Sequence, residues 1–163
     1  MILKNSINSS KIGSVTNIMI NTIKVKKMVD TAIVPTYGSK ESACFDLYVD
    51  MRGQKECVIQ SHETVKLGTG LAFELPDACY MEIKQRSGLA SKGVFPVGGI
   101  CDADYRGEVM VLLHNGSNQP YTVKDHDRIA QAICCHYNHL DFYVSDELTK
   151  TQRGNNGFGS SGK

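Results

Sequence analysis

Short β-like runs fill the sequence between residues 22 and 137, and they constrain the fold more than any other feature. Turn signals built from Pro, Gly, Asn and Asp separate them, as at 76–77, 115–116 and 125–127, and also at 35–38. A helix is plausible only near 89–92, and it would be brief. Many short strands at this spacing predict an all-β sandwich or barrel. The runs are 22–29, 57–59, 64–73, 80–84, 109–114, 121–123 and 129–137.

The composition narrows the classes of partner. A chain of 163 residues with 41% hydrophobic and 21% charged residues supports one globular domain with a real core. Its net charge of +1 gives no broad basic surface for nucleic acid, so any bound anion must be held by a few placed cations. The sequence shows neither a signal peptide nor an apolar run of the roughly 20 residues needed to span a bilayer. We therefore expect no nucleic-acid partner, no membrane partner and an intracellular location, cytoplasmic or, for a eukaryotic or viral source, nuclear.

The six cysteines do not form a metal-binding pattern. None belongs to a Cys-x-x-Cys pair or to a Cys/His cluster with zinc spacing. Cys134 and Cys135 are adjacent, so on a strand their side chains would face opposite sides. Reduced thiols in an intracellular compartment are the favoured interpretation, and secretion with disulfides is the alternative.

The two ends differ in composition from the interior. Residues 1–21 are rich in Ser, Asn and Ile without sustained alternation, and we expect a disordered lead, with an edge strand as the alternative. The barrel domain is expected over 22–148 and a mobile Gly-rich C-terminal arm over 149–163. That arm is either a plain disordered terminus or a lid for a phosphorylated ligand, because its glycines free backbone N–H groups for an anion and its phenylalanine offers a face to a base.

The stretch 98–110, Gly-Gly-Ile-Cys-Asp-Ala-Asp-Tyr-Arg-Gly-Glu-Val-Met, carries the densest set of polar groups. Two apolar arms flank a polar turn, with glycines where a backbone must pass close to another group. This pattern predicts a β-hairpin with a long turn. Such a hairpin offers a ligand main-chain N–H and C=O groups beside two carboxylates and a phenol. Taken alone, a plain solvated loop is the alternative.

Five segments in order resemble the five motifs of the trimeric dUTPase family, the deoxyuridine triphosphate nucleotidohydrolases. The resemblance covers nearly everything except the lead. It implies a jelly-roll-like β-barrel of the β-clip type, and a homotrimer whose three sites lie at subunit boundaries. It also implies Mg²⁺-assisted hydrolysis of dUTP to dUMP and pyrophosphate, which keeps uracil out of DNA and supplies dUMP for dTMP synthesis. The segments are 43–47, 86–92, 98–110, 127–131 and the tail 151–162.

The resemblance assigns the reaction chemistry to a few side chains. Asp102 is expected to orient and deprotonate the water that attacks the α-phosphorus. Gln131 and Asp46 are expected to order water around the phosphates or the metal, so that Asp46 contacts Mg²⁺ only through water. The metal would be held chiefly by triphosphate oxygens and water. Asp104 would point away on an extended backbone and is expected to be structural, and Arg128 is expected to make a structural ion pair.

The resemblance also assigns the binding residues. Uracil would be read by main chain in a slot lined by Gly99, Ile100, Cys101 and Met110, whose walls also disfavour a 5-methyl group. Tyr105 would pack on the sugar and leave no room for a ribose 2′-hydroxyl.

Phosphate contacts are expected from two further segments. Arg86, Ser87 and Gly88 would bridge phosphate oxygens. In the tail, Arg153 and Ser160 or Ser161 would meet the γ-phosphate, while Phe158, beside Gly159, stacks on uracil. Closure of the tail would exclude water other than the nucleophile.

Four positions depart from the family pattern. Cys44 and His126 replace a usual glycine, Gln85 a usual proline and Cys101 a usual isoleucine. A left-handed backbone at Cys44 or His126 would lower stability, because both residues carry a Cβ. Cys101 could also make the site sensitive to thiol reagents.

Two other functions remain open. A dCTP deaminase shares the fold but carries a proton-shuttling Glu on the strand that leaves the hairpin, where this chain has Leu112. A nucleotide-binding or protein-interaction module without turnover, acting as a sensor, is the second alternative. Retention of Asp102, Arg86 and Gln131 argues against it.

Overall fold

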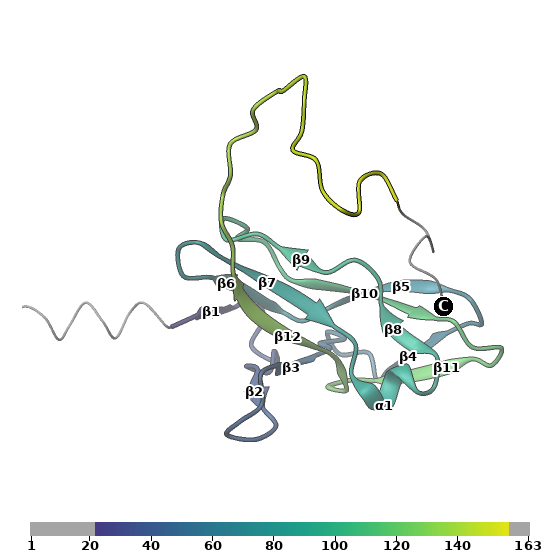
Figure 1. Cartoon of the computed structure of the whole chain (residues 1–163). Helices are drawn as coiled ribbons and strands as arrows, with labels where there is room; N and C mark the ends of the chain where they lie inside the picture. Colours follow the sequence, from purple (N-terminus) through teal and green to yellow (C-terminus); the bar gives the residue numbers. More distant parts are fainter. Residues whose placement is uncertain (1–21, 157–163) are drawn as a thin grey trace, which may run out of the picture.

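The structure is a computed structural model that describes residues 22–156 (Figure 1). The expected lead 1–21 and the tail residues 157–163 lie outside the described residues. Strands dominate the described part, and its single helix has four residues, so the predicted all-β class is confirmed. No helix within 22–156 is long and apolar enough to cross a membrane. The elements are β1 Lys24–Lys27, β2 Thr36–Tyr37, β3 Phe45–Tyr48, β4 Glu56–Ile59, β5 Thr64–Gly68, β6 Leu71–Glu74, β7 Cys79–Lys84, α1 Ser87–Ala90, β8 Val94–Pro96, β9 Ile100–Cys101, β10 Met110–Asn115, β11 Tyr121–Lys124 and β12 Arg128–His136.

The strands form four antiparallel sheets. The largest has the order β2-β3-β12-β7-β9, the next has the order β5-β10-β8, and β1-β6 and β11-β4 form two-stranded sheets. β12 lies at the centre of the five-stranded sheet and pairs with β7 over residues 131–136. A β-bulge between Arg128 and Ala130 interrupts its pairing with β3.

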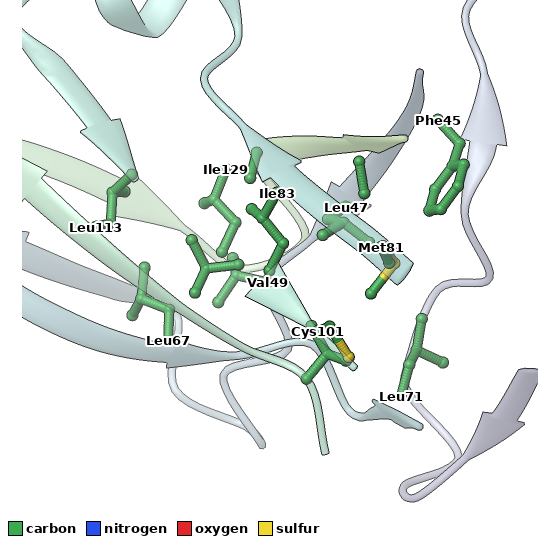
Figure 2. Packing of buried hydrophobic residues seen from close by; sticks show 14 of the residues in the cluster. Phe45, Leu47, Val49, Leu67, Leu71, Met81, Ile83, Cys101, Leu113 and Ile129 are labelled. Carbon is green, nitrogen blue, oxygen red and sulfur yellow. The ribbon is translucent and has the colours of Figure 1, made fainter. Parts of the chain in front are cut away.

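One hydrophobic cluster takes side chains from all four sheets. On β10 the alternation expected for a strand is visible, since Val111 and Leu113 are buried while Leu112 is exposed. Figure 2 shows Leu113 and Leu67 packed on the same core as Met81. Burial of this apolar surface is the main driving force for the fold.

Several local expectations are corrected by the structure. The predicted run 64–73 is two strands, because the chain turns at Gly70, whose φ of +68° is left-handed. A Cβ at Gly70 would lie 2.7 Å from the Cβ of Ala32, so the close packing there also requires glycine. The predicted turn at 35–38 contains the short strand β2, and α1 begins at Ser87, two residues earlier than expected. The short strands β3 and β8 were not predicted.

After β12 the chain leaves the barrel as an extended arm. Residues 137–156 contain no helix or strand, and Figure 1 shows this yellow-green segment running away from the sheets. It carries the most exposed large apolar side chains in the described part of the chain. These are Leu140, Phe142, Tyr143, Val144 and Leu148.

Candidate active site

The stretch 98–110 forms a hairpin that is closed at its base and open at its middle. β8 pairs with β10, and the amide of Val97 still donates to the carbonyl of Leu112 at 2.8 Å. Beyond that point β9 pairs with β7 instead, and no hydrogen bond joins β9 to β10 in the part of the chain that is described. A cavity of about 240 Å³ lies between the separated arms. The hairpin expected from the sequence is therefore present, but its arms belong to different sheets.

The walls of this cavity bring together most of the predicted base and sugar residues. Gly99, Ile100, Cys101, Tyr105 and Met110 all line it. Its other lining residues are Ile83, Pro96, Val97, Gly98, Glu108, Val109, Val111 and Leu112. The pocket is smaller than the roughly 300–1,000 Å³ typical of sites for drug-sized ligands, which favours a small heterocycle with its sugar.

Two glycines let the backbone approach its neighbours closely. At Gly99, φ is +127°, and a Cβ would lie 2.8 Å from the carbonyl oxygen of Ile83. At Gly107 a Cβ would lie 2.4 Å from the Tyr105 hydroxyl, so the Tyr105 ring lies directly against this glycine. Any larger residue at 107 would push the ring from its place.

Cys101 points into the core beneath the cavity. It is only 8% exposed, and Figure 2 shows it within the same cluster as Met81 and Leu71. Burial raises the pKa of its thiol, and the negative charge of Asp102 raises this pKa further. Cys101 therefore serves as a neutral apolar wall.

Asp102 is exposed and lies at a neighbouring opening of about 660 Å³ on the other side of Ile100. Asp104 lines the same opening, so it does not lie apart from Asp102 as expected. The reason is local: the amide of Tyr105 donates to the carbonyl of Asp102 at 3.2 Å, and this turn replaces the extended backbone on which the expectation rested. Ile100 is common to both openings.

A second polar group forms near α1, where β3 ends and β12 begins. Arg86 donates from Nε to Oδ1 of Asp46 at 2.8 Å, and Arg128 donates from Nη1 to Oδ2 at 3.1 Å. The Asp46 carboxylate is thus shared by two guanidinium groups, and the bulge at Arg128 is the kind of irregularity that redirects a side chain. The structural ion pair expected for Arg128 is present. Gln131 on β12 is paired with Asp46 on the neighbouring strand β3, and its side-chain amide donates to the carbonyl of Gln85 at 2.9 Å.

Arg86 and Gly88 open onto a third cavity of about 290 Å³, which also holds Lys92 and Arg128. Ser87 is the first residue of α1 and is exposed. Three cations and one carboxylate, that of Asp127, line this opening, and its excess of positive charge suits phosphate oxygens.

Within one chain, the hairpin cavity and the Arg86 cavity share no lining residue. Arg153 is exposed on the arm, where its Nε donates to the carbonyl of Asn156 at 2.9 Å. Phe158, Gly159, Ser160 and Ser161 lie outside the described residues. Glu108 and Lys92 line these cavities but were not predicted as site residues, since no feature of a single sequence distinguishes their charges from those of solvated surface residues.

Comparison with known proteins identifies the family. The sequence profile described as dUTPase matches residues 30–162. The chain belongs to the dUTPase family. It is 41% identical over 144 residues to the deoxyuridine 5′-triphosphate nucleotidohydrolase of Nautilia profundicola, covering 86% of this chain and 99% of that protein. It is 42% identical over 142 residues to the mitochondrial enzyme of that name from Dictyostelium discoideum, covering 86% and 77%.

Solved structures of dUTPases share the fold. The dUTPase of Staphylococcus bacteriophage 80alpha, solved with dUPNHPP, gives a TM-score of 0.80 at 23% identity and covers 88% of this chain and 99% of that one. The dUTPase of phage phi11 of S. aureus gives 0.72 at 18% identity, covering 80% and 100%. These comparisons confirm the resemblance, the jelly-roll-like β-clip barrel and the predicted class of enzyme, a dUTP diphosphatase.

Proposed function

We propose that this chain hydrolyses dUTP to dUMP and pyrophosphate by in-line attack of water on the α-phosphorus. One observation carries the proposal: a small cavity opens where the two arms of the 98–110 hairpin separate. The edges of β9 and β10 that face each other across it are not bonded to each other. A base placed between them can complete both edges.

Main-chain recognition gives selectivity for uracil. The uracil edge presents a donor at N3 flanked by carbonyl acceptors, whereas cytosine presents an acceptor at N3 and a donor at N4. A backbone that matches one order leaves buried polar groups unpaired with the other, which opposes binding by roughly 1–3 kcal/mol for each unpaired group. The side chains of Ile83 and Met110, which line the cavity, are apolar and do not distinguish uracil from cytosine by hydrogen bonds. This discrimination is left to the main chain.

Tyr105 accounts for the choice of sugar. Its ring forms one wall of the cavity and is held against Gly107, while its hydroxyl donates to the Glu108 carbonyl at 3.0 Å. A ring fixed on both sides cannot move away from a ribose 2′-hydroxyl. A deoxyribose has no such group and fits.

Asp102 is the proposed general base. It follows Cys101 directly, is exposed to solvent and lies at the opening next to Ile100, so its carboxylate can hold a water beside the nucleotide. Gln131 is proposed to order this water, and Arg86, Ser87 and Gly88 to neutralise the charge that develops on the phosphates.

Mg²⁺ is the proposed cofactor, held chiefly by the triphosphate. Within residues 22–156, no group of three or more His, Cys, Asp or Glu side chains is arranged to hold a metal. Each oxygen of Asp46 already accepts an arginine N–H, which fits contact with the ion through water and not directly. When bound, the ion would screen the phosphate charge and fix the triphosphate conformation.

We also propose a homotrimer with shared sites. Two observations support it: the hairpin cavity and the Arg86 cavity are separate within one chain, and the arm exposes apolar side chains such as Phe142 and Val144. The residues from 149 onward would then act as a lid, with Arg153, Phe158, Gly159, Ser160 and Ser161 reaching a bound nucleotide. The proposed location is inside the cell, in the cytoplasm or the nucleus. There, hydrolysis of dUTP would keep uracil out of DNA and would supply dUMP for dTMP synthesis.

Parallel assays with dUTP, dCTP and UTP test the activity. We expect rapid pyrophosphate release with dUTP and little with the other two. Ammonia released from dCTP would establish a deaminase instead, and tight binding of dUTP without any product would establish a sensor. Either outcome would overturn the proposal.

A further inference from the structure

Glu108 stands at the point where the 98–110 stretch re-enters the barrel, and its side chain is only 18% exposed. Its Oε1 accepts the amide of Gly70 at 2.8 Å, and its Oε2 pairs with Nη2 of Arg52. The carboxylate also lies tightly over β5, because a Cβ at Gly68 would be 2.5 Å from Oε1. None of these partners belongs to the cavity.

The main chain of Glu108 faces the other way, toward the hairpin cavity. Its carbonyl accepts the Tyr105 hydroxyl at 3.0 Å, and both residues line the cavity. One residue therefore joins the sugar wall to two neighbouring turns, one at 51–54 after β3 and one at 69–70 between β5 and β6. The turn at 51–54, which carries Arg52, has a further anchor, since Oδ1 of the buried Asp50 accepts the Arg52 amide at 2.9 Å.

The residue that follows Glu108 strengthens this connection. Val109 donates to the carbonyl of Leu71 at 2.8 Å, and its own carbonyl accepts the hydroxyl of Thr69 at 2.8 Å. The turn between β5 and β6 is thus bonded to both 108 and 109. A displacement of the Glu108 side chain would be passed to its carbonyl and from there to the Tyr105 ring.

We propose that Glu108 is a positioning residue that sets the discrimination between deoxyribose and ribose. It acts through the Tyr105 hydroxyl and needs its carboxylate anchored by Gly70 and Arg52. The inference rests on the proposed function, because it assigns a sugar-selecting role to Tyr105. It concerns the sugar wall, because Glu108 acts through the Tyr105 hydroxyl, whereas the base is proposed to be read by the main-chain edges of β9 and β10.

The test compares ratios of kcat/KM for the variant E108A and the wild type. We expect the dUTP/UTP ratio to fall about tenfold, as for the loss of one hydrogen-bonded anchor, while the dUTP/dCTP ratio stays within about twofold. E108Q, whose amide oxygen can still accept from Gly70, should restore most of the dUTP/UTP ratio. Y105F, which keeps the ring and removes the hydroxyl, should lower this ratio as E108A does.

E74A is the matched control, since Glu74 is the exposed last residue of β6, pairs with Lys24 on β1 and does not line the cavity. It should change neither ratio. If E108A keeps the wild-type dUTP/UTP ratio, or if both ratios fall together as in a general loosening, the positioning role is wrong. If E108A does not fold, the variants Y105F and R52A provide the test instead. A wild-type dUTP/UTP ratio in both of them overturns the inference. A wild type that does not hydrolyse dUTP would instead overturn the proposed function.

Discussion

His126 has a side chain on a left-handed backbone, with φ of 63°. Such a conformation destabilises a residue with a Cβ by about 1–2 kcal/mol. Glycine removes this strain, but its greater conformational freedom in the unfolded chain offsets part of the gain. We expect H126G to raise the free energy of unfolding by about 0.5–1 kcal/mol. The contact of its ring with Asp125, at 3.8 Å and half exposed, is too weak to reverse the sign.

Cys44 supplies the control, because it also replaces a family glycine but does not have a positive φ. C44G should therefore give no gain and a loss from its part-buried side chain. Urea unfolding at equal protein concentration measures both variants. A destabilised H126G would show that the left-handed turn carries no strain.

Cys101 is predicted to react slowly with thiol reagents. The thiolate is the reactive form, and burial together with Asp102 raises the pKa of this thiol. Alkylation by iodoacetamide at pH 8, followed residue by residue by mass spectrometry, should be slower at Cys101 in the folded protein than in the urea-unfolded chain. A non-hydrolysable dUTP analogue should slow it further. Rapid labelling of Cys101 in the folded protein would contradict its assignment as a buried wall.

Single residues show how far the sequence could be interpreted. Asp102, Tyr105 and Arg86 could be assigned roles because their motifs match a family, and the structure places them beside cavities. The orientation of Asp104 could not be predicted, because it depends on a turn held by one hydrogen bond. Glu108 was missed since its partners, Arg52 and Gly70, are distant in sequence.

At the scale of elements, periodicity predicts long strands better than short ones. The nine-residue β12 and the six-residue β7 were anticipated, whereas β8 was missed because its three residues are too few for a period to be detected. The opening of the hairpin was beyond prediction for a related reason. It arises because β9 finds its partner in β7, a tertiary choice that local sequence does not encode.

The C-terminal tail is an element whose removal should separate folding from turnover. Among the described residues, 22–156, the last member of the hydrophobic core is Ala132, so we expect deletion of 151–163 to change the urea midpoint little. Turnover of dUTP should fall at least about a hundredfold, because the proposed lid and Arg153 are lost. A truncated protein with full activity would remove the lid from the account.

At the scale of the whole molecule, shared sites predict complementation. Neither D102N nor the 151–163 truncation should be active alone. Refolded together in equal amounts, they should recover about a quarter of wild-type activity, since three quarters of random trimers are mixed and each mixed trimer then holds one intact site. No recovery, in a mixture whose mass by light scattering is that of a trimer, would show that Asp102 and the tail of one site come from the same chain and would contradict a lid supplied by a neighbouring chain.

The destination of the oxygen atom from water tests the central claim most directly. Hydrolysis of dUTP in ¹⁸O-water, with mass spectrometry of both products, distinguishes attack at the α-phosphorus from attack at the β-phosphorus. We predict ¹⁸O in dUMP only, formed at a rate that D102N lowers by a factor of at least about a hundred while nucleotide binding is kept. Label in pyrophosphate, or near-normal labelling of dUMP by D102N, would contradict the account.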